Sequence, residues 1–232
     1  MLRAQYNAAE RKVIVRVDDI ERKYDLIPEF HCSECGTPYI NEDRCSNHNY
    51  DLMDKTLPIG PYYPIRKWKN MKNDLSVDIV NFKSHMVFGL FLGLLMSIAI
   101  NKIYPELKEF DALVPIPRTT VELKEDVLTK QKYDPQLLLA EIASEKTGIK
   151  VVKAIKKIEP YYQHRKSQEE RRQIVTHAEE YFEVADGLVS RGDNIILIDD
   201  VRTTGSTGSA CAKVIRKAKV GKIYLLVLGI TV

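Results

Sequence analysis

The chain is poor in cysteine and shows no segment of the kind that marks secretion. Of its 232 residues only 4 are cysteines, and three of these lie together between positions 32 and 45. That clustering differs from the even spread of a secreted disulfide scaffold. The N-terminal stretch MLRAQYNAAERKVIVRV has no apolar core of signal-peptide length. We therefore expect a cytoplasmic protein.

Long hydrophobic runs are also scarce, and the longest is MVFGLFLGLLMSIAI, from Met86 to Ile100. As a helix it would be about 22 Å long, against roughly 30 Å of bilayer hydrocarbon, so we expect no membrane span. It has no Lys-rich polar face for a membrane surface, and its two glycines permit close packing. We expect a helix buried on all sides, either under a sheet of the same chain or against a second subunit in a homodimer.

A strong charge imbalance is absent as well, because 35 Lys and Arg oppose 32 Asp and Glu, giving +3. This balance permits a nucleic-acid or phosphate partner but argues against extensive nonspecific DNA binding. The sequence has no internal repeat or low-complexity tract. From residue 112 onward, short apolar strands alternate with helical segments. That alternation predicts an α/β fold with a mostly parallel sheet flanked by helices.

The segment NIILIDDVRTTGSTGSA, residues 194–210, joins an apolar strand to two acids and a run of small residues. It has neither the Gly-Lys-Ser/Thr of a Walker P-loop nor a Rossmann glycine fingerprint. Ligands of parallel sheets bind beyond the carboxyl ends of the strands, so we expect Asp199 and Asp200 at a ligand. Carboxylates there can accept hydrogen bonds from vicinal sugar hydroxyls or hold water on a magnesium ion.

The stretch that follows the acids is suited to phosphate. It carries three Thr, one Ser and one Gly and leads into a helix expected from about Ser206 to Lys217. Backbone N–H groups at a helix N-terminus bind phosphate, and Gly205 lets the backbone come close. An N-cap alone would need one such hydroxyl, so we predict a ribose 5-phosphate site. The predicted residues are Arg202, Thr203, Thr204, Gly205, Ser206 and Thr207.

The sequence IILIDDVRTTGST resembles the signature for 5-phosphoribosyl-1-pyrophosphate (PRPP) in the type I phosphoribosyltransferases. The resemblance implies that Asp199 and Asp200 are catalytic residues on the ribose hydroxyls and that Mg²⁺ accompanies PRPP. It implies transfer of the phosphoribosyl group to a small-molecule nitrogen acceptor, with release of pyrophosphate. No residue in the sequence is an obvious general base, which leaves the acceptor open.

Weaker matches, in the same order along the chain, resemble the ComF (competence protein F-like) family within this group. They are VNFKSH, which contains Lys83, then DALVPIP, PQLLLAEIA and YQHRKSQEERRQIV. The family's usual Arg-Gly-Phe-Asn-Gln is KYDPQ here, and only Gln136 is retained. The family association also leaves open a non-catalytic protein that senses PRPP or associates with DNA.

The resemblance also implies residues for the rest of PRPP. Arg118 and Thr119, after the first core strand, correspond to a pyrophosphate-binding turn. Gln163 and Arg171 correspond to a loop that closes over the substrate and excludes water. A solvated surface arginine is the alternative for Arg118, and a simple amphipathic helix is the alternative for the loop.

The segment HCSECGTPYINEDRCSNH contains two close pairs of metal-binding residues. Their spacing predicts a structural zinc site made by Cys32, Cys35, Cys45 and His48, with His31 as the competing fourth ligand. The fourth cysteine, Cys211, is expected to be a packed residue. We expect an N-terminal extension (1–30), a zinc-binding ribbon (31–58) and a phosphoribosyltransferase-like domain (59–232).

Overall fold

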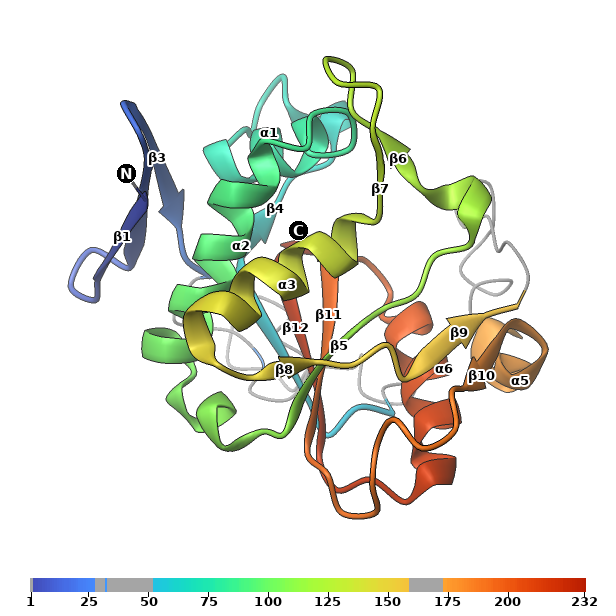
Figure 1. Cartoon of the computed structure of the whole chain (residues 1–232). Coiled ribbons are helices and arrows are strands. Elements are labelled where there is room, and N and C mark those ends of the chain that lie inside the picture. The colour runs from blue at the N-terminus through green and yellow to red at the C-terminus, as the bar shows by residue number, and fades with distance from the viewer. Residues whose placement is uncertain (1, 28–31, 33–51, 159–172) are drawn as a thin grey trace.

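The computed structural model describes residues 2–27, 32, 52–158 and 173–232 (Figure 1). At its centre lies a five-stranded sheet whose neighbouring strands all run parallel, in the order β4-β12-β11-β5-β8. The strands are β4 (Lys55–Tyr62), β12 (Ile223–Thr231), β11 (Ile195–Arg202), β5 (Ala112–Pro115) and β8 (Lys150–Val151). The predicted α/β architecture with a parallel sheet is therefore confirmed.

Helices cover both faces of the sheet because its strands are apolar on both sides. Ile196 and Ile198 of β11 belong to one buried cluster, and Ile195 and Leu197 belong to another on the opposite face. The elements of the first cluster include α1 (Asp74–Asn81), α2 (Phe88–Ile98) and α3 (Pro135–Thr147). Those of the second include α6 (Ser206–Ile215) and the two-stranded ribbon of β9 (Ile155–Lys157) and β10 (Phe182–Val184).

Shorter elements connect these layers. They are the hairpin of β6 (Lys124–Glu125) and β7 (Lys132–Tyr133), α5 (Ala178–Tyr181), the 3-10 turns Ile65–Lys67, Pro105–Glu109, Thr120–Glu122 and Arg216–Ala218, and the π-helical turn Ala99–Ile103. The segment VVKAIKKI, residues 151–158, contributes to two strands in two different sheets, because the chain crosses from β8 to the ribbon after Val151. The helix predicted from about Ser206 to Lys217 is α-helical from Ser206 to Ile215 and continues as the 3-10 turn Arg216–Ala218.

The apolar helix α2 is buried within its own chain. It crosses α3 closely, because a Cβ on Gly89 would lie 2.8 Å from Leu138 Cδ2 and one on Gly93 would lie 2.6 Å from Ile142 Cβ. Of the two alternatives for this segment, the structure shows burial in the same chain, between the sheet, α3 and the N-terminal strands. Across the described ranges, no helix has both the length and the apolarity needed to cross a membrane.

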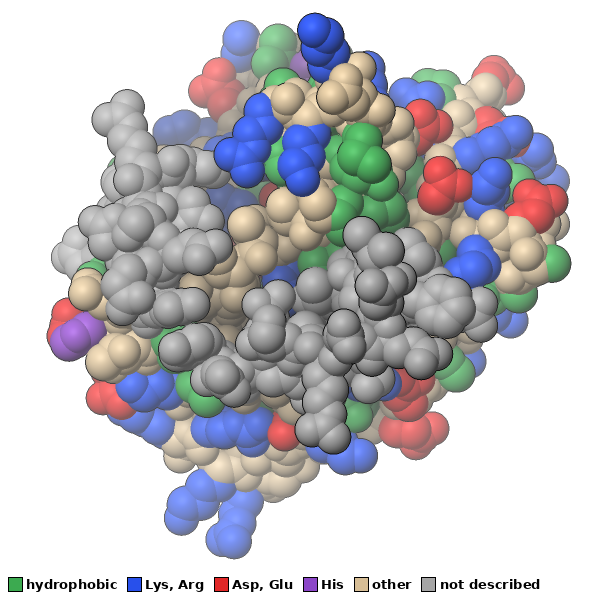
Figure 2. Space-filling view, turned by 180° about the vertical axis from the view of Figure 1, so that it is seen from behind, with side chains coloured by type: hydrophobic (Ala, Val, Ile, Leu, Met, Phe, Trp, Pro, Cys, Tyr) green, Lys and Arg blue, Asp and Glu red, His purple; other side chains and the backbone are tan. Residues whose placement is uncertain are grey.

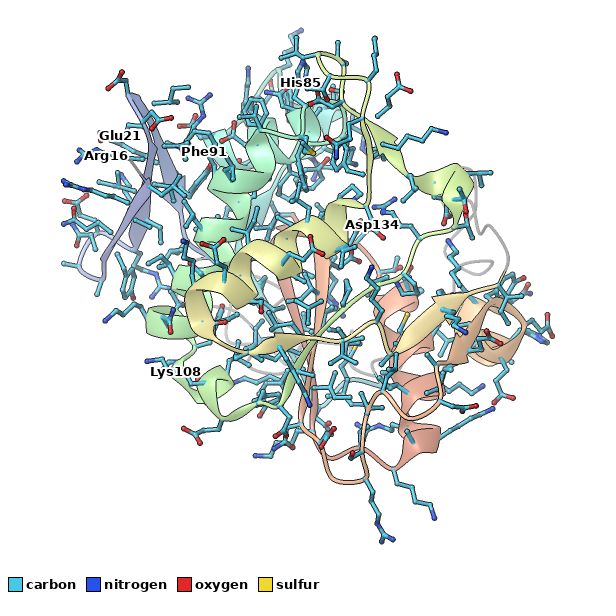
Figure 3. The ribbon with its side chains drawn as sticks, in the orientation of Figure 1. Arg16, Glu21, His85, Phe91, Lys108 and Asp134 are labelled. Atoms are coloured by element: carbon cyan, nitrogen blue, oxygen red, sulfur yellow. The ribbon has the colours of Figure 1, made fainter. Side chains whose placement is uncertain are left out.

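The first residues form a three-stranded antiparallel meander beside α2. Its strands are β1 (Leu2–Asn7), β2 (Lys12–Val17) and β3 (Ile20–Asp25). Figure 3 labels Arg16 and Glu21 on this meander, where Arg16 Nε donates to the Glu21 carboxylate at 2.6 Å. The buried side chains Val13 and Val15 of β2 join the first core cluster, so the meander extends the core.

A buried polar contact joins the meander to α1. Tyr24 Oη donates to Asp78 Oδ2 at 2.7 Å, and Arg22 Nε lies 3.2 Å from the same oxygen. Burial raises the pKa of Asp78, while Tyr24 and Arg22 act in the opposite direction. The Arg22 guanidinium also lies 5.7 Å from the ring centroid of Phe91 on α2. These contacts hold the N-terminal meander against α1 and α2.

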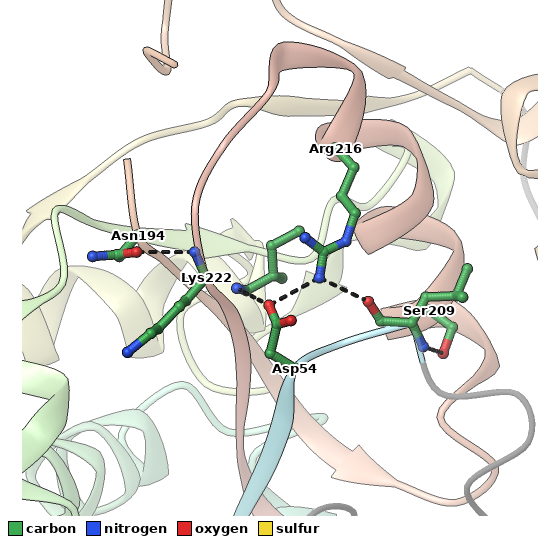
Figure 4. A network of polar contacts seen from close by, with 7 residues as sticks. Asp54, Asn194, Ser209, Arg216 and Lys222 are labelled. Carbon is green, nitrogen blue, oxygen red and sulfur yellow. Dashed lines mark hydrogen bonds and ion pairs between the residues drawn. The ribbon is translucent and has the colours of Figure 1, made fainter. Parts of the chain in front are cut away.

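At the amino end of the sheet, Asp54 connects the start of β4 to neighbouring elements (Figure 4). Its Oδ2 accepts hydrogen bonds from Arg216 Nη2 at 2.8 Å and from the backbone N–H of Ile223 at 2.7 Å. Nearby, the Asn194 side chain accepts the N–H of Lys222 at 2.9 Å. The chain therefore enters β4 through contacts with the turn Arg216–Ala218 and with β12, and β4 crosses the boundary expected between residues 58 and 59.

We predict that Tyr24→Phe lowers the free energy of unfolding by about 1–3 kcal/mol, because it leaves the buried Asp78 carboxylate with one fewer donor. Denaturant unfolding followed by circular dichroism measures this change. The matched control is Tyr6→Phe in the same meander, expected within about 0.5 kcal/mol of wild type. Equal losses for the two variants would contradict the structural role given to the Tyr24–Asp78 contact.

Candidate active site

The two predicted acids lie where β11 continues past its neighbour β5. β11 pairs with β5 only as far as Ile198, opposite Pro115, whereas its pairing with β12 continues to Arg202. Asp199 and Asp200 are thus beyond the carboxyl end of β5, and both line a cleft at that edge of the sheet. This is the edge at which parallel sheets bind ligands.

The loop after β11 surrounds a small cavity at the N-terminus of α6. Its volume is about 50 Å³, and it is lined by residues 201–208 together with Asp199 and Leu225. Space of this size holds on the order of four ordered waters, which is comparable to the oxygens of one phosphate group. The predicted phosphate-binding residues from Arg202 to Thr207 therefore share one cavity.

Glycine is required at position 205 for two reasons. Gly205 is the N-cap of α6 with a φ of 76°, which is the left-handed region. A Cβ there would also lie 2.9 Å from Nε of Arg202, whose side chain is buried beneath the loop. Gly205 has no side chain to cap α6; the hydroxyl of Thr204 accepts the N–H of Ser206 at 3.4 Å and contacts the Ser206 hydroxyl at 2.9 Å.

A larger cleft opens from the small cavity. The two share Asp199, Val201, Thr203 and Thr207 as lining residues. The cleft measures about 680 Å³, within the range of roughly 300–1,000 Å³ for small-molecule sites. Its other lining residues are Tyr62, Pro64, Arg66, Lys83, Ile116, Pro117, Arg118, Val121, Glu122, Leu123, Lys124, Gln136, Lys157, Asp200 and Thr231. Figure 2 shows Lys and Arg side chains beside hydrophobic ones on the upper part of the molecule's back face.

A buried glutamine connects the turn after β5 to the end of β11. Gln136, 1% exposed, donates from Nε2 to Asp199 Oδ1 at 2.9 Å and accepts at Oε1 from Arg118 Nε at 2.5 Å. Asp134, labelled in Figure 3, caps α3 and accepts the N–H of Gln136 at 3.0 Å. Arg118 is therefore half-buried and hydrogen-bonded at the cleft, unlike a fully solvated surface arginine.

The turn that carries Arg118 is fastened by Glu122. Oε2 of Glu122 accepts the N–H and the hydroxyl of Thr119 at 2.8 and 3.1 Å, and Oε1 accepts Lys157 Nζ at 2.5 Å. The Lys157 and Glu122 side chains are only 8% and 11% exposed. Thr119 does not line the cleft in this arrangement. In this arrangement Thr119 fastens the turn that carries Arg118, and its contact with pyrophosphate stays a prediction.

The two acids have different proton affinities. Burial and the charge of Asp200 raise the pKa of Asp199 to about 7. Burial also acts to raise the pKa of Asp200, but Lys83 and Arg118 outweigh it and hold the value below the ordinary one. At neutral pH Asp200 is the stronger acceptor and carries the negative charge next to the cations.

Three cations converge on one side of the cleft. Burial lowers the pKa of Lys124, and repulsion from Arg118 and Lys83 lowers it further. Such mutual repulsion is relieved when a polyanion binds. The family resemblance indicated Lys83, but nothing in the sequence indicated Lys124 or the Glu122–Lys157 pair. These residues come from β6, the turn before it and β9, and only the fold brings them together.

Other predicted site residues lie outside the part of the chain that the structure describes. These are Gln163, Arg171, Cys35, Cys45, His48 and the competing zinc ligand His31. Cys32 is described and buried, and the described residues contain no group of three or more His, Cys, Asp or Glu arranged to hold a metal. Cys211 is fully buried in α6, and burial raises the pKa of its thiol, which confirms a packed residue.

No protein-family model matches this chain, and no curated protein matches it. Similar solved structures are adenine phosphoribosyltransferases. One is 15% identical with a TM-score of 0.36, covering 57% of this chain and 65% of that one. The Trypanosoma brucei enzyme, in complex with AMP, pyrophosphate and ribose-5-phosphate, is 12% identical with a TM-score of 0.41, covering 66% and 68%. The Leishmania tarentolae enzyme is 12% identical with a TM-score of 0.39, covering 74% and 82%.

This chain spans just under two thirds of the first of these neighbours. Likeness of this degree does not assign the chain to a family, so its function has to be inferred from its own residues.

We predict that Lys157→Met destabilises the protein by about 3–5 kcal/mol, because it leaves the buried Glu122 carboxylate without its cation. The double variant Glu122→Gln/Lys157→Met should recover most of this loss. The control is Lys156→Met, whose side chain on the same strand is 66% exposed. Denaturant unfolding at pH 7 measures all three, and a loss for Lys157→Met no larger than the control's would contradict the prediction.

The pH dependence of this pair has a defined sign. Burial acts to raise the pKa of Glu122, but Lys157 and the donors of Thr119 lower it below 4.5 overall. A carboxyl with a lowered folded-state pKa contributes stability that is complete above the unfolded value and is lost as the pH falls through the folded one. The stability difference between wild type and Glu122→Gln should therefore shrink below pH 4.5.

Proposed function

We propose that the cleft binds PRPP with magnesium and that the protein transfers its phosphoribosyl group to a nitrogen acceptor, releasing pyrophosphate. The observation that carries this proposal is the continuity of the two cavities. A phosphate-sized cavity at the N-terminus of α6 and a larger cleft share Asp199, Val201, Thr203 and Thr207. A ligand with a phosphate joined to a sugar fits that connection.

Each part of PRPP has a matching group of residues. The loop from Arg202 to Thr207 supplies small hydroxyls and a helix N-terminus for the 5-phosphate. Asp199 and Asp200 supply acceptors for the ribose hydroxyls. Arg118, Lys83 and Lys124 supply positive charge for pyrophosphate. Gln163 and Arg171 are proposed to add donors when their loop closes.

The proposed reaction is a displacement at the anomeric carbon of the ribose. The acceptor nitrogen forms a bond to this carbon, and the bond to pyrophosphate breaks, with both electrons leaving on the pyrophosphate oxygen. Asp200, ionised at neutral pH, stabilises the positive charge that builds on the sugar ring. Arg118 and Lys83 stabilise the negative charge on the leaving group. The proton of the acceptor leaves to solvent or to the pyrophosphate.

Magnesium fits the donor set of this cleft. The carboxylates of Asp199 and Asp200 are hard oxygen groups suited to holding an ion through its water ligands. When bound with PRPP, the ion neutralises charge on the pyrophosphate. The chain's own residues orient the sugar and the leaving group.

Within the type I phosphoribosyltransferases, the order of motifs along the chain supports a ComF-like protein with a structural zinc ribbon. The proposed ligands are Cys32, Cys35, Cys45 and His48. A segment rich in polar residues and poor in aliphatic ones gains its folding energy from the metal.

Asp199→Asn and Asp200→Asn are each expected to weaken binding of magnesium-PRPP by about a hundredfold, since each replaces a carboxyl acceptor for the ribose hydroxyls by an amide. Isothermal titration calorimetry on the full chain measures the affinity. The control is Asp186→Asn, an exposed acid outside the cleft, which should bind as wild type does. Wild-type affinity in both site variants would refute the ribose contacts.

The acceptor is identified by measuring pyrophosphate release from magnesium-PRPP against a panel of nucleobases and amines. Turnover with one acceptor supports the enzyme. Binding of PRPP without release on any acceptor supports the alternative, a PRPP-sensing protein.

The zinc proposal predicts one zinc per chain by elemental analysis after purification without added metal. Cys35→Ser and Cys45→Ser should each lose the metal, because three ligands hold zinc much more weakly than four. Cys211→Ser, a buried cysteine in α6, is the control and should retain one zinc. A zinc-free wild-type protein with an intact fold would contradict the ribbon.

A further inference from the structure

Gln136 occupies a position that the proposed reaction does not itself require. It is almost fully buried in the first turn of α3, and its side-chain amide reaches residues on two other elements. Asp199 at the end of β11 is 2.9 Å away, and Arg118 on the turn after β5 is 2.5 Å away. The amide is therefore the one described side chain seen to bond both the ribose acid and the leaving-group arginine.

The chemistry of its two partners fixes which way the amide points. A guanidinium can only donate hydrogen bonds, so the oxygen of Gln136 must face Arg118. The amide nitrogen then faces Asp199 and can only donate to it. A donor aimed at this oxygen also favours the ionised form of Asp199, against burial and the charge of Asp200.

The backbone of Gln136 is held as firmly as its side chain. Asp134 accepts the N–H groups of Gln136 and Leu137 at 3.0 and 3.3 Å, and Pro135 begins the helix. Tyr133, just before this cap, donates its hydroxyl to the backbone oxygen of Phe82. The start of α3 is thus fixed to the segment that also carries Lys83.

We infer that Gln136 is a positioning residue that assembles the two halves of the site, holding Asp199 for the ribose with its amide nitrogen and aiming Arg118 at the pyrophosphate with its amide oxygen. The inference rests on the proposed function and extends it to a residue of the cleft wall whose proposed part is to orient two other side chains. The two halves would then be oriented relative to each other by one rigid group on a capped helix. This matters because displacement at the anomeric carbon requires both halves in register.

Two variants separate the two bonds. Gln136→Glu keeps an oxygen for Arg118 but turns a carboxylate oxygen toward Asp199 in place of the donor. Gln136→Met has a similar length and removes both bonds. Gln131→Met, an exposed glutamine in the β6–β7 hairpin, is the matched control. Phosphorus NMR titrations with ribose 5-phosphate and with magnesium pyrophosphate measure the affinity of each half separately, and thermal melting monitors the fold.

Gln136→Met should weaken both fragments by about tenfold, the loss expected for one charge-assisted hydrogen bond in each half. Gln136→Glu should weaken ribose 5-phosphate by at least about tenfold and pyrophosphate by distinctly less. If Gln136→Met does not fold, the difference between the two affinity losses in Gln136→Glu still tests the positioning role. The control should leave both affinities unchanged.

Equal losses on both fragments in Gln136→Glu, or no loss on either, overturn the positioning role while the proposed function stands. A wild-type protein that binds neither fragment nor PRPP overturns the proposed function, and this inference with it.

Discussion

The parallel pairing of β11 with β12 and β5 determines where every polar group of the site lies. The strand is buried on both faces as far as Ile198, so no charged side chain is tolerated before that residue. β5 ends opposite Ile198, while β12 supports β11 for four more residues. The acids and the loop from Arg202 to Thr207 are therefore held by a rigid sheet and at the same time line open cavities.

The partial burial of the two acids has to be compensated, and the compensation comes from distant parts of the chain. Asp200 stays ionised because Lys83 and Arg118 lie near it, and Asp199 is held by the Gln136 amide. The turn that carries Arg118 is in turn fixed by Glu122 and Lys157. Removing one member leaves another partly desolvated polar group without its partner, and the loss of that partner adds to the loss of the bond. The site is better regarded as one connected network than as a loop with a few contacts.

The sequence predicted the parts of this arrangement that are local. β11, the turn at Gly205 and α6 follow from an apolar run, a small-residue loop and a helix start in direct succession. The buried α2 followed from its apolar run, although its cover by the N-terminal meander did not. The Glu122–Lys157 ion pair and the position of Lys124 could not be predicted from the sequence. Lys157 is far along the chain from the other two residues, and the three come together only when β6, β9 and the sheet are in place. Gln136 was identified as the one residue kept from the family's Arg-Gly-Phe-Asn-Gln motif. Its bonds to Arg118 and Asp199 could not be predicted, because they depend on how α3 crosses the sheet.

A crystal structure of the protein with magnesium and PRPP tests the central claim most directly. The account predicts the 5-phosphate in the cavity formed by residues 201–208, with the ribose hydroxyls within hydrogen-bond distance of Asp199 and Asp200. Pyrophosphate should lie toward Arg118 and Lys83. A ligand bound elsewhere, or bound in the cleft with its 5-phosphate away from the N-terminus of α6, would contradict it.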